Sequence, residues 1–235
     1  MSAGWPDPAR RKPPRSSPLY AVRAPLARWL HEEAARLPPG ARVLDVGCGA
    51  KPYYPFFADG AATYVGVDIV ENPLADLTGA VESLPVADAS FDVVLCNQLL
   101  EHADDPALAV RELRRVTAPG GRVLASTHGV QVYHPSPDDL WRWTHAGLER
   151  LFRDNADWAS IRVRPGAGTA SCLAMLMGFY VALAARRAHA APLGGAVVSL
   201  LNGAAETIDR RVPSLREPGP GTLFANLHVV AEVAP

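Results

Sequence analysis

The sequence predicts an α/β protein with a mostly parallel sheet, and two segments near its beginning carry this prediction. Residues 43–46 form an apolar run around one acidic residue and lead into a turn that contains Gly47 and Gly49. Further along the chain, the apolar residues 64–67 end at Asp68. Such runs are typical of strands buried on both faces of a parallel sheet. Glycines after the first strand allow a close approach of backbone to ligand, and Asp68 can accept hydrogen bonds from a ribose diol, so we expect a nucleoside site.

The other elements follow from periodicity and from turn residues. Apolar spacing predicts a helix over residues 19–37, which Pro38-Pro39-Gly40 ends. Helices and strands then alternate to about Thr127, as a βαβ fold requires. The fourth strand is expected to end at Asn97 and the fifth at about Thr127, with a helix over residues 106–116 between them that is capped by Asp104 or Asp105. A loop over 127–137, a helix over 144–152, and strands over 161–165 and 223–233 follow.

Composition restricts the domain count and the classes of partner. The 235 residues fit one α/β domain, which we place at residues 18–235, after a mobile basic arm over residues 1–17 that is rich in proline and arginine. A net charge of −1 gives no electrostatic case for nucleic acid as a partner.

The cysteines and the beginning of the chain favour a reducing compartment. Cys48, Cys96 and Cys172 are widely spaced and have no CxxC pattern, so neither a disulfide framework nor a metal site is expected. Residues 1–17 lack the apolar core of a signal peptide. We therefore expect a cytoplasmic protein.

Five segments in order resemble the class I S-adenosylmethionine-dependent methyltransferases, within the group that has the small-molecule type-11 domain. The first turn departs from the dinucleotide fingerprint, since Pro52 stands where a third glycine is needed. The matching segments are residues 44–49 (Leu-Asp-Val-Gly-Cys-Gly), the strand end at Asp68, residues 84–94, the Leu-Glu-His run within residues 99–106, and the Pro-Gly-Gly turn within residues 114–124.

The resemblance implies a Rossmann-like seven-stranded, mostly parallel sheet with helices on both faces, and S-adenosylmethionine as the methyl donor. The resemblance also implies which residues contact each part of the donor. Asp45 would contact the amino group, the backbone of Gly47 and Gly49 would lie beside the methionine part, and Asn97 would line the methionine moiety. Asp68 would bind the ribose, and Ile69 and the Val81 N–H would contact the adenine. Many relatives have aspartate where this chain has Ala80, so the contact to the adenine amino group is absent or comes from another residue such as Glu82.

Two histidines are the candidate general bases. His128 lies nearest the predicted end of the fifth strand and is the first choice, and His134 in the loop that follows is the second. In relatives the histidine of the Leu-Glu-His run is often structural, so we interpret His102 as a packing or capping residue. An amine acceptor that is already neutral would need positioning and no base.

Aromatic residues suggest where the acceptor binds. Trp141, Arg142 and Trp143 belong to a segment that resembles one in bacterial methyltransferases of glycans and secondary metabolites. The two tryptophans with the arginine either wall the acceptor pocket or begin a helix with packed rings. Tyr53 and Tyr54, just after the glycine turn, are candidates to cover the methyl group, and one of them is expected only to pack.

An apolar helical insertion over about residues 168–210 separates the last two strands. Its two uncharged runs, residues 166–185 and 188–205, are divided by Arg186-Arg187, and the first approaches the length of a membrane span. The second run is too short and too rich in glycine to cross back. A membrane span by the first run would therefore place the last β-strand on the opposite side of the membrane from the rest of the sheet. We expect helices that roof the acceptor pocket and form a homodimer interface. Membrane contact is the less favoured alternative.

The predicted function is methyl transfer from S-adenosylmethionine to a small-molecule acceptor, with S-adenosylhomocysteine as product. O-methylation is favoured over N-methylation, in secondary-metabolite or saccharide biosynthesis, and no metal is expected. One alternative is methylation of a glycolipid or lipid-linked saccharide at a membrane surface. Another is a non-catalytic subunit that binds the cofactor and a partner, although an intact donor turn argues against it.

Overall fold

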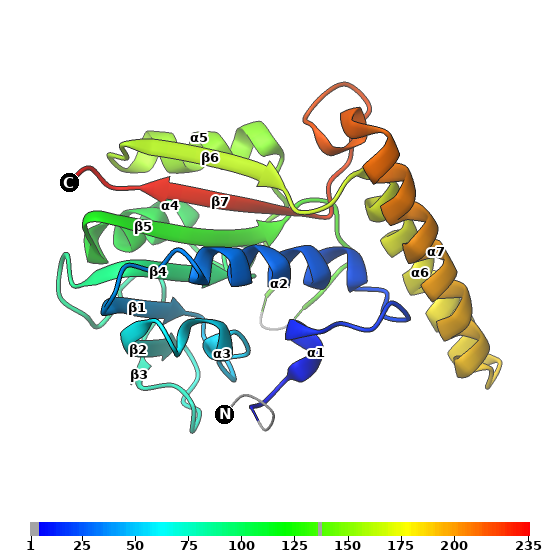
Figure 1. The fold of residues 1–235 in the computed structure, drawn as a ribbon, viewed down its shortest axis with the longest axis horizontal. Coiled ribbons are helices and arrows are strands. Elements are labelled where there is room, and N and C mark those ends of the chain that lie inside the picture. Colours follow the sequence, from blue (N-terminus) through cyan, green and yellow to red (C-terminus); the bar gives the residue numbers. More distant parts are fainter. Residues whose placement is uncertain (1–4, 136–137) are drawn as a thin grey trace.

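The computed structural model describes residues 5–135 and 138–235, and a single seven-stranded sheet forms its centre (Figure 1). The strand order is β3-β2-β1-β4-β5-β7-β6. The strands are β1 (Ala41–Val46), β2 (Ala61–Asp68), β3 (Leu77–Thr78), β4 (Phe91–Asn97), β5 (Thr117–His128), β6 (Ser160–Pro165) and β7 (Asn226–Glu232). Pairing is parallel from β3 to β5, whereas β7 runs antiparallel to both β5 and β6. The predicted Rossmann-like sheet is therefore confirmed.

Helices cover both faces of the sheet. The helices are α1 (Pro8–Arg11), α2 (Tyr20–Ala34), α3 (Tyr54–Phe57), α4 (Pro106–Val116), α5 (His145–Asn155), α6 (Thr169–Arg187), α7 (Ala191–Arg211) and the 3₁₀ turn η1 (Pro213–Arg216). Side chains of α2 and α3 share one buried cluster with the sheet, and side chains of α4 and α5 share the other. The layers are thus helix, sheet and helix.

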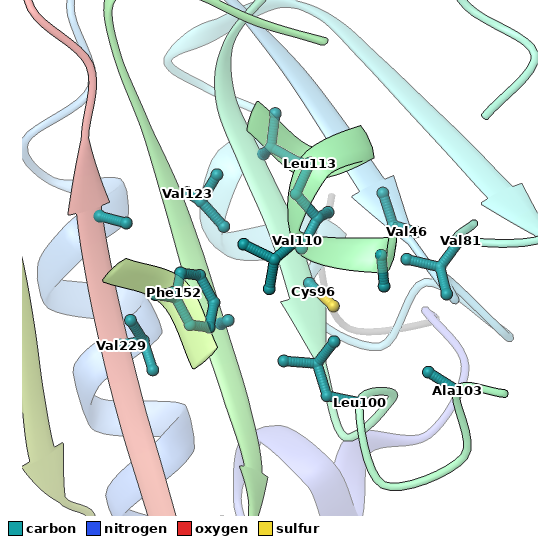
Figure 2. Close-up of a cluster of buried hydrophobic side chains, with 14 of the residues drawn as sticks. Val46, Val81, Cys96, Leu100, Ala103, Val110, Leu113, Val123, Phe152 and Val229 are labelled. Carbon is teal, nitrogen blue, oxygen red and sulfur yellow. The ribbon is translucent and has the colours of Figure 1, made fainter. Parts of the chain in front are cut away.

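Alternation along the strands explains why both faces are apolar. Val43 packs toward α2, whereas its neighbour Leu44 packs toward α4, and both are fully buried. Val93 and Val94 divide between the two faces in the same way. Because successive side chains point to opposite faces, a strand covered on both sides is apolar throughout. Figure 2 shows the larger cluster, in which Val110 and Leu113 of α4 lie among the strand side chains.

Helix caps set two of the predicted boundaries. Asp105 accepts a hydrogen bond from the Leu108 N–H at 2.9 Å and caps α4, and Thr144 accepts one from the Gly147 N–H at 3.0 Å and caps α5. Both side chains satisfy amides that have no partner within their own helix. The helix expected over residues 19–37 is shorter, because it covers Tyr20–Ala34.

Residues 5–17 lie against the domain, which differs from the predicted mobile arm. The Trp5 Nε1 donates to the Lys51 carbonyl at 2.8 Å, and an Arg11 guanidinium nitrogen donates to the Pro52 carbonyl at 2.6 Å. Asn202 of α7 donates to the Arg15 carbonyl at 2.7 Å. These partners are backbone carbonyls and one distant amide, which a local charge and proline pattern does not reveal. Residues 1–4 of the predicted arm lie outside the described residues.

The insertion between β6 and β7 is a helical hairpin, made of α6 and α7. In Figure 1 it stands on the side of the sheet where the parallel strands end, and it extends past the body of the domain. Asp209 of α7 accepts from the Ala170 and Ser171 amides, each at 3.0 Å, and so caps α6 from across the hairpin. In the described residues, α6 is the one helix long and apolar enough to cross a membrane, with a mean hydropathy of 1.4. About a third of that stretch is buried against the protein, and the rest is exposed or only partly covered.

Candidate functional site

A pocket of about 430 Å³ opens at the carboxyl ends of the parallel strands. Its wall combines the turn after β1, the end of β2, the segment after β4 and the loop after β5, and α2 and α6 close its sides. Both groups of predicted residues line it. Gly47 and Asp68 lie at the ends of β1 and β2, and His128 lies at the end of β5, which β1 and β4 separate from β2, so the two groups form different ends of the pocket. Ligands bind at this edge in open α/β sheets. The volume suits a ligand of nucleoside size with an acceptor beside it.

Asp68, at the end of β2, is placed to hold a diol. One of its carboxylate oxygens accepts from the Gly49 amide at 2.7 Å and the other from the Val70 amide at 3.1 Å. Each oxygen keeps a further lone pair, and the residue lines the pocket. Backbone amides thus fix a carboxylate that can accept two more hydrogen bonds from ribose hydroxyls.

The turn after β1 requires glycine at Gly47. Its φ is +69°, in the left-handed region, and an added Cβ would lie 3.0 Å from the Leu99 side chain. Gly47 also donates its amide to the Val67 carbonyl at 2.9 Å, which holds the turn against β2. Gly49 has a φ of +49° and holds Asp68 without lining the pocket. The turn therefore presents bare backbone to the pocket, as a methionine moiety would need.

Asp45 lies beneath this turn, buried and outside the pocket wall. Its carboxylate accepts from the Tyr64 hydroxyl at 2.7 Å. Burial raises the pKa of Asp45 to about 7, and the Tyr64 hydrogen bond opposes that rise. A contact to a donor amino group would therefore run through an intervening group, as expected for a water-mediated contact.

Two residues assigned to the adenine line the pocket, whereas Asn97, which was assigned to the methionine moiety, does not. Ile69, which is 62% exposed, and Val81 both line the pocket and offer apolar faces for a flat ring. Glu82 lines it as well. The structure does not bring Asn97 into the wall, because its amide oxygen accepts from the Ser126 hydroxyl at 3.1 Å. The next residue, Gln98, lines the pocket instead and has a φ of +55°.

Three further polar groups lie in the wall, and of these Arg23 and Gln131 were not found from the sequence, whereas Tyr53 was. Arg23 of α2 lines the pocket, and desolvation by burial lowers the pKa of its guanidinium, with neighbouring Arg10 acting in the same direction. The Tyr53 hydroxyl and the Gln131 amide nitrogen are buried there without a hydrogen-bond partner in the described part of the chain. Buried polar groups normally have a hydrogen-bond partner, which a water molecule or a polar ligand can supply. Arg23 adds a positive charge to this part of the wall.

His128 forms a buried pair with Glu101 at the other end. The His128 Nε2 lies 3.3 Å from a Glu101 carboxyl oxygen, and the second oxygen accepts from the Thr127 hydroxyl at 2.7 Å. Burial lowers the pKa of His128 and raises the pKa of Glu101, so both changes favour the uncharged forms. The backbone of β5 carries Thr127 and His128, and the segment after β4 carries Glu101, so two adjacent strands align the pair. The Leu-Glu-His run contained this signal, and the glutamate rather than the histidine reaches the candidate base.

His134 stands near His128 in the loop after β5. The two rings have centroids 6.3 Å apart, and the His102 ring lies 5.8 Å from that of His134. All three histidines line the pocket. His102 also contacts the carbonyl of Asp138, a loop residue, through Nδ1.

Arg142 and the tryptophans support this loop from outside the pocket wall. Arg142 forms a two-pronged ion pair with Asp139, which in turn accepts from the His134 amide at 2.8 Å. Trp141 stacks on Trp143 at 5.7 Å, and its Nε1 donates to the Ala103 carbonyl at 2.8 Å. Of the two open alternatives, the structure favours packing for the tryptophans. Arg142 positions the loop rather than walling the pocket.

The remaining tyrosine pair divides as expected. Tyr53 lines the pocket, whereas Tyr54 packs against Trp5 at 4.5 Å and edge-on against Tyr64 at 5.1 Å. Consecutive residues on a short helix point in different directions, so only one of the two can face the pocket. Among the described residues, no group of three or more histidine, cysteine or acidic side chains is arranged to hold a metal ion.

The comparison with protein families matches one continuous part of the chain. Residues 44–125 match the family described as "Methyltransferase domain". The match begins in β1 and ends within β5, so it contains Asp45, Gly47 and Asp68 but stops before His128.

Curated relatives share the same part of the chain. The ubiquinone biosynthesis O-methyltransferase of Bordetella bronchiseptica is 34% identical over 142 residues, which cover 54% of this chain and 57% of that protein. The malonyl-(acyl-carrier protein) O-methyltransferase of Erwinia pyrifoliae is 40% identical over 126 residues, which cover 48% of each. The chain thus spans about half the length of the curated relatives it matches.

Solved structures share the fold over most of the chain. Phosphoethanolamine N-methyltransferase 2 of Haemonchus contortus, solved with S-adenosyl-L-methionine, has a TM-score of 0.58 at 15% identity and covers 91% of this chain and 53% of that one. The cyclase SpnF has a TM-score of 0.54 at 20% identity, with coverage of 88% and 81%. At these identities the likeness shows the fold alone. Its presence in a cyclase means that the chemistry must be argued from the site.

Proposed function

We propose that this chain, whose residues 44–125 match a methyltransferase domain, transfers a methyl group from S-adenosylmethionine to an oxygen of a small-molecule acceptor. The observation that carries the proposal is one pocket with two different ends. Asp68 and the Gly47 backbone form an end suited to a nucleoside and an amino acid, and the buried His128–Glu101 pair forms an end suited to proton removal. S-adenosylhomocysteine is the expected product.

The donor end binds by charge and shape. Asp68 accepts the ribose hydroxyls, Ile69 and Val81 flank the adenine, and Arg23 pairs with the methionine carboxylate. S-adenosylmethionine supplies a sulfonium-bound methyl group that is already activated. The protein therefore has to align an acceptor atom with that carbon–sulfur bond and, for a hydroxyl acceptor, remove its proton.

His128 is the proposed base, and Glu101 is its positioning partner. Burial keeps the resting imidazole neutral and lowers its pKa to about 3, so an ionised Glu101 beside it is needed to raise its affinity for a proton. As His128 takes up the acceptor's proton, the adjacent Glu101 carboxylate balances the new positive charge and holds the ring in place. Because burial raises the pKa of Glu101, turnover should rise with pH as this carboxyl loses its proton. His134 is the alternative base, since it faces the same pocket.

Oxygen is favoured as the acceptor atom because a hydroxyl acceptor needs a general base such as His128 with its positioning carboxylate, whereas a neutral amine does not. The names of the two matched relatives, both O-methyltransferases, support the same choice. The Trp141–Trp143 segment supports secondary-metabolite or saccharide biosynthesis as the setting. The three cysteines, all free and buried, support a reducing cytoplasmic location.

Asp68→Ala tests the donor site. The change removes a charged acceptor of two hydrogen bonds, each worth about 1.5–3 kcal/mol before water replaces it. We expect at least a tenfold loss of S-adenosylhomocysteine affinity by calorimetry, with an unchanged circular dichroism spectrum. Asp154→Ala on the exposed side of α5 is the matched control. Unchanged affinity in the Asp68 variant would remove the donor from this pocket.

A further inference from the structure

The outer surface of the α6–α7 hairpin carries an exposed apolar stripe on each helix. On α6 it contains Leu173, Met177 and Tyr180, and on α7 it contains Leu193, Val197 and Leu200, at helical spacing. Leu200 is 74% exposed and Tyr180 is 69% exposed. More than half of the large apolar side chains that are exposed in the described residues belong to this hairpin and the residue after it. Such a concentration of exposed apolar side chains is typical of a surface that contacts a protein or a membrane.

The charged residues of the hairpin indicate which kind of partner covers this apolar surface. Arg186 and Arg187 are exposed at the tip of the hairpin, and Arg210 and Arg211 are exposed at its base. The two acidic residues of the hairpin are already engaged within the protein. Glu206 pairs with Arg15 at 2.6 Å, and Asp209 caps α6 through two backbone amides. The exposed charge of the hairpin is therefore positive at both ends, with an uncharged apolar stretch between them.

We propose that the α6–α7 hairpin docks on the surface of an anionic lipid bilayer. The apolar stripes would enter the interface between headgroups and acyl chains, and the arginine pairs at both ends would extend to the phosphates. A second copy of this chain is a poorer occupant. Antiparallel pairing of two hairpins would place the Arg186–Arg187 tip beside the partner's Arg210–Arg211 base, and parallel pairing would place tip beside tip. Both arrangements bring like charges together.

The position of the hairpin gives the docking a consequence for the pocket. Phe179 of α6 lines the pocket wall, and it is the one hairpin residue in the described chain that does so. The predicted roof over the acceptor is thus reduced to a single side chain, and the rest of the hairpin projects beyond it (Figure 1). Docking would hold the pocket close to the bilayer, which, resting on the proposed function, points to acceptors carried on a lipid.

Vesicle binding tests the docking without any need for turnover. The full chain is sedimented with vesicles of phosphatidylcholine alone and with mixed phosphatidylcholine–phosphatidylglycerol vesicles. We expect strong binding to the mixed vesicles only. The double variant R186E/R187E should lose about 25-fold or more in partitioning, from about fivefold for each arginine removed near a charged membrane. The variant L193S/L200S should also lose binding, and because both side chains are exposed it should keep the melting temperature of the parent.

A matched control separates docking from general charge attraction. R150E/R153E makes the same charge change on the exposed face of α5, away from the hairpin, and should keep its vesicle binding within a few fold. An equal loss in this control would overturn the proposal, as would absence of binding to mixed vesicles by the parent. A dimer in analytical ultracentrifugation that L193S/L200S dissociates would assign the hairpin to a second copy instead. Loss of vesicle binding with intact S-adenosylhomocysteine binding would leave the proposed function standing.

Discussion

The two ends of the pocket are built in different ways. The donor end rests on two adjacent strands, and its contacts are short and mostly to backbone, as in the Asp68 bonds to the Gly49 and Val70 amides. The acceptor end depends on a loop after β5, whose shape is set by the ion pair of Arg142 with Asp139. A donor common to many enzymes is held by common geometry, whereas the end that faces a particular acceptor is held by side chains that can vary.

His128→Ala should show the largest effect, confined to the acceptor end. Loss of a positioned base lowers turnover by about 10²–10⁴. S-adenosylhomocysteine affinity should stay within a few fold, because His128 lies at the opposite end from Asp68. Single-turnover kinetics and calorimetry measure the two quantities. The same loss in His134→Ala with normal turnover in His128→Ala would move the base into the loop.

Asp45→Asn should show a pH-dependent effect at the donor end. Burial raises the pKa of Asp45 to about 7, whereas an unfolded aspartate titrates near 3.9. Between these values the folded state holds a proton that the unfolded state has lost, so the parent loses stability as pH rises through this window. The asparagine side chain of the variant does not titrate, and the variant's advantage in free energy of unfolding should grow by about 2–4 kcal/mol from about pH 4 to about pH 8. Urea melts of parent and variant measure this difference. A constant difference across pH would mean that Asp45 is ionised throughout.

Arg142→Ala should weaken the acceptor end alone. It leaves Asp139, whose side chain is 2% exposed, without its cation, and so releases the loop that carries His134. We expect kcat/KM for the acceptor to fall about tenfold or more, about 1.4 kcal/mol, with donor affinity preserved. Arg142→Lys should recover part of the loss, since an ammonium pairs as a point charge without the two-pronged geometry. Equal losses in donor and acceptor binding would show that the two ends are not independent.

A pair of glycine variants should give the smallest effect and isolate the donor turn. Gly40 and Gly47 both have positive φ, but a Cβ on Gly40 would meet nothing within 4 Å, whereas one on Gly47 would crowd Leu99. Gly40→Ala should cost about 1 kcal/mol of stability from backbone strain alone. Gly47→Ala should cost somewhat more and should also weaken S-adenosylhomocysteine binding, which calorimetry beside thermal melts would detect. Equal behaviour of the two variants would mean that the turn does not touch the donor.

The difference between the donor end and the acceptor end of the pocket also determines how much of the site could be predicted from the sequence. The turn after β1 and the aspartate at the end of β2 are local patterns, because each residue acts through the strand that carries it. The two-residue strand β3 has no pattern long enough to detect. The replacement of Asn97 by Gln98 in the pocket wall depends on one positive φ, which residue type does not indicate.

Contacts between distant segments account for the rest. The charge-free runs predicted the limits of the α6–α7 hairpin, but not that it would leave most of the pocket open. The role of Arg142 requires knowing that Asp139 also holds the His134 amide, and the role of Arg23 requires knowing that α2 reaches the pocket. Residues 5–17 pack through hydrogen bonds to backbone carbonyls. Because every residue has a carbonyl, the sequence carries no signal for these contacts.

The place of β7 in the sheet has a consequence for the order of folding. This strand lies between β5 and β6 and pairs His128 with Asn226, so partners about a hundred residues apart must meet. On a ribosome, β5 and β6 are made long before β7, and their facing edges stay unpaired while the apolar hairpin emerges. The Asn226 side chain donates to the Thr127 carbonyl at 2.7 Å, directly beside the candidate base. The acceptor end of the pocket therefore takes its final shape only after β7 has been synthesised.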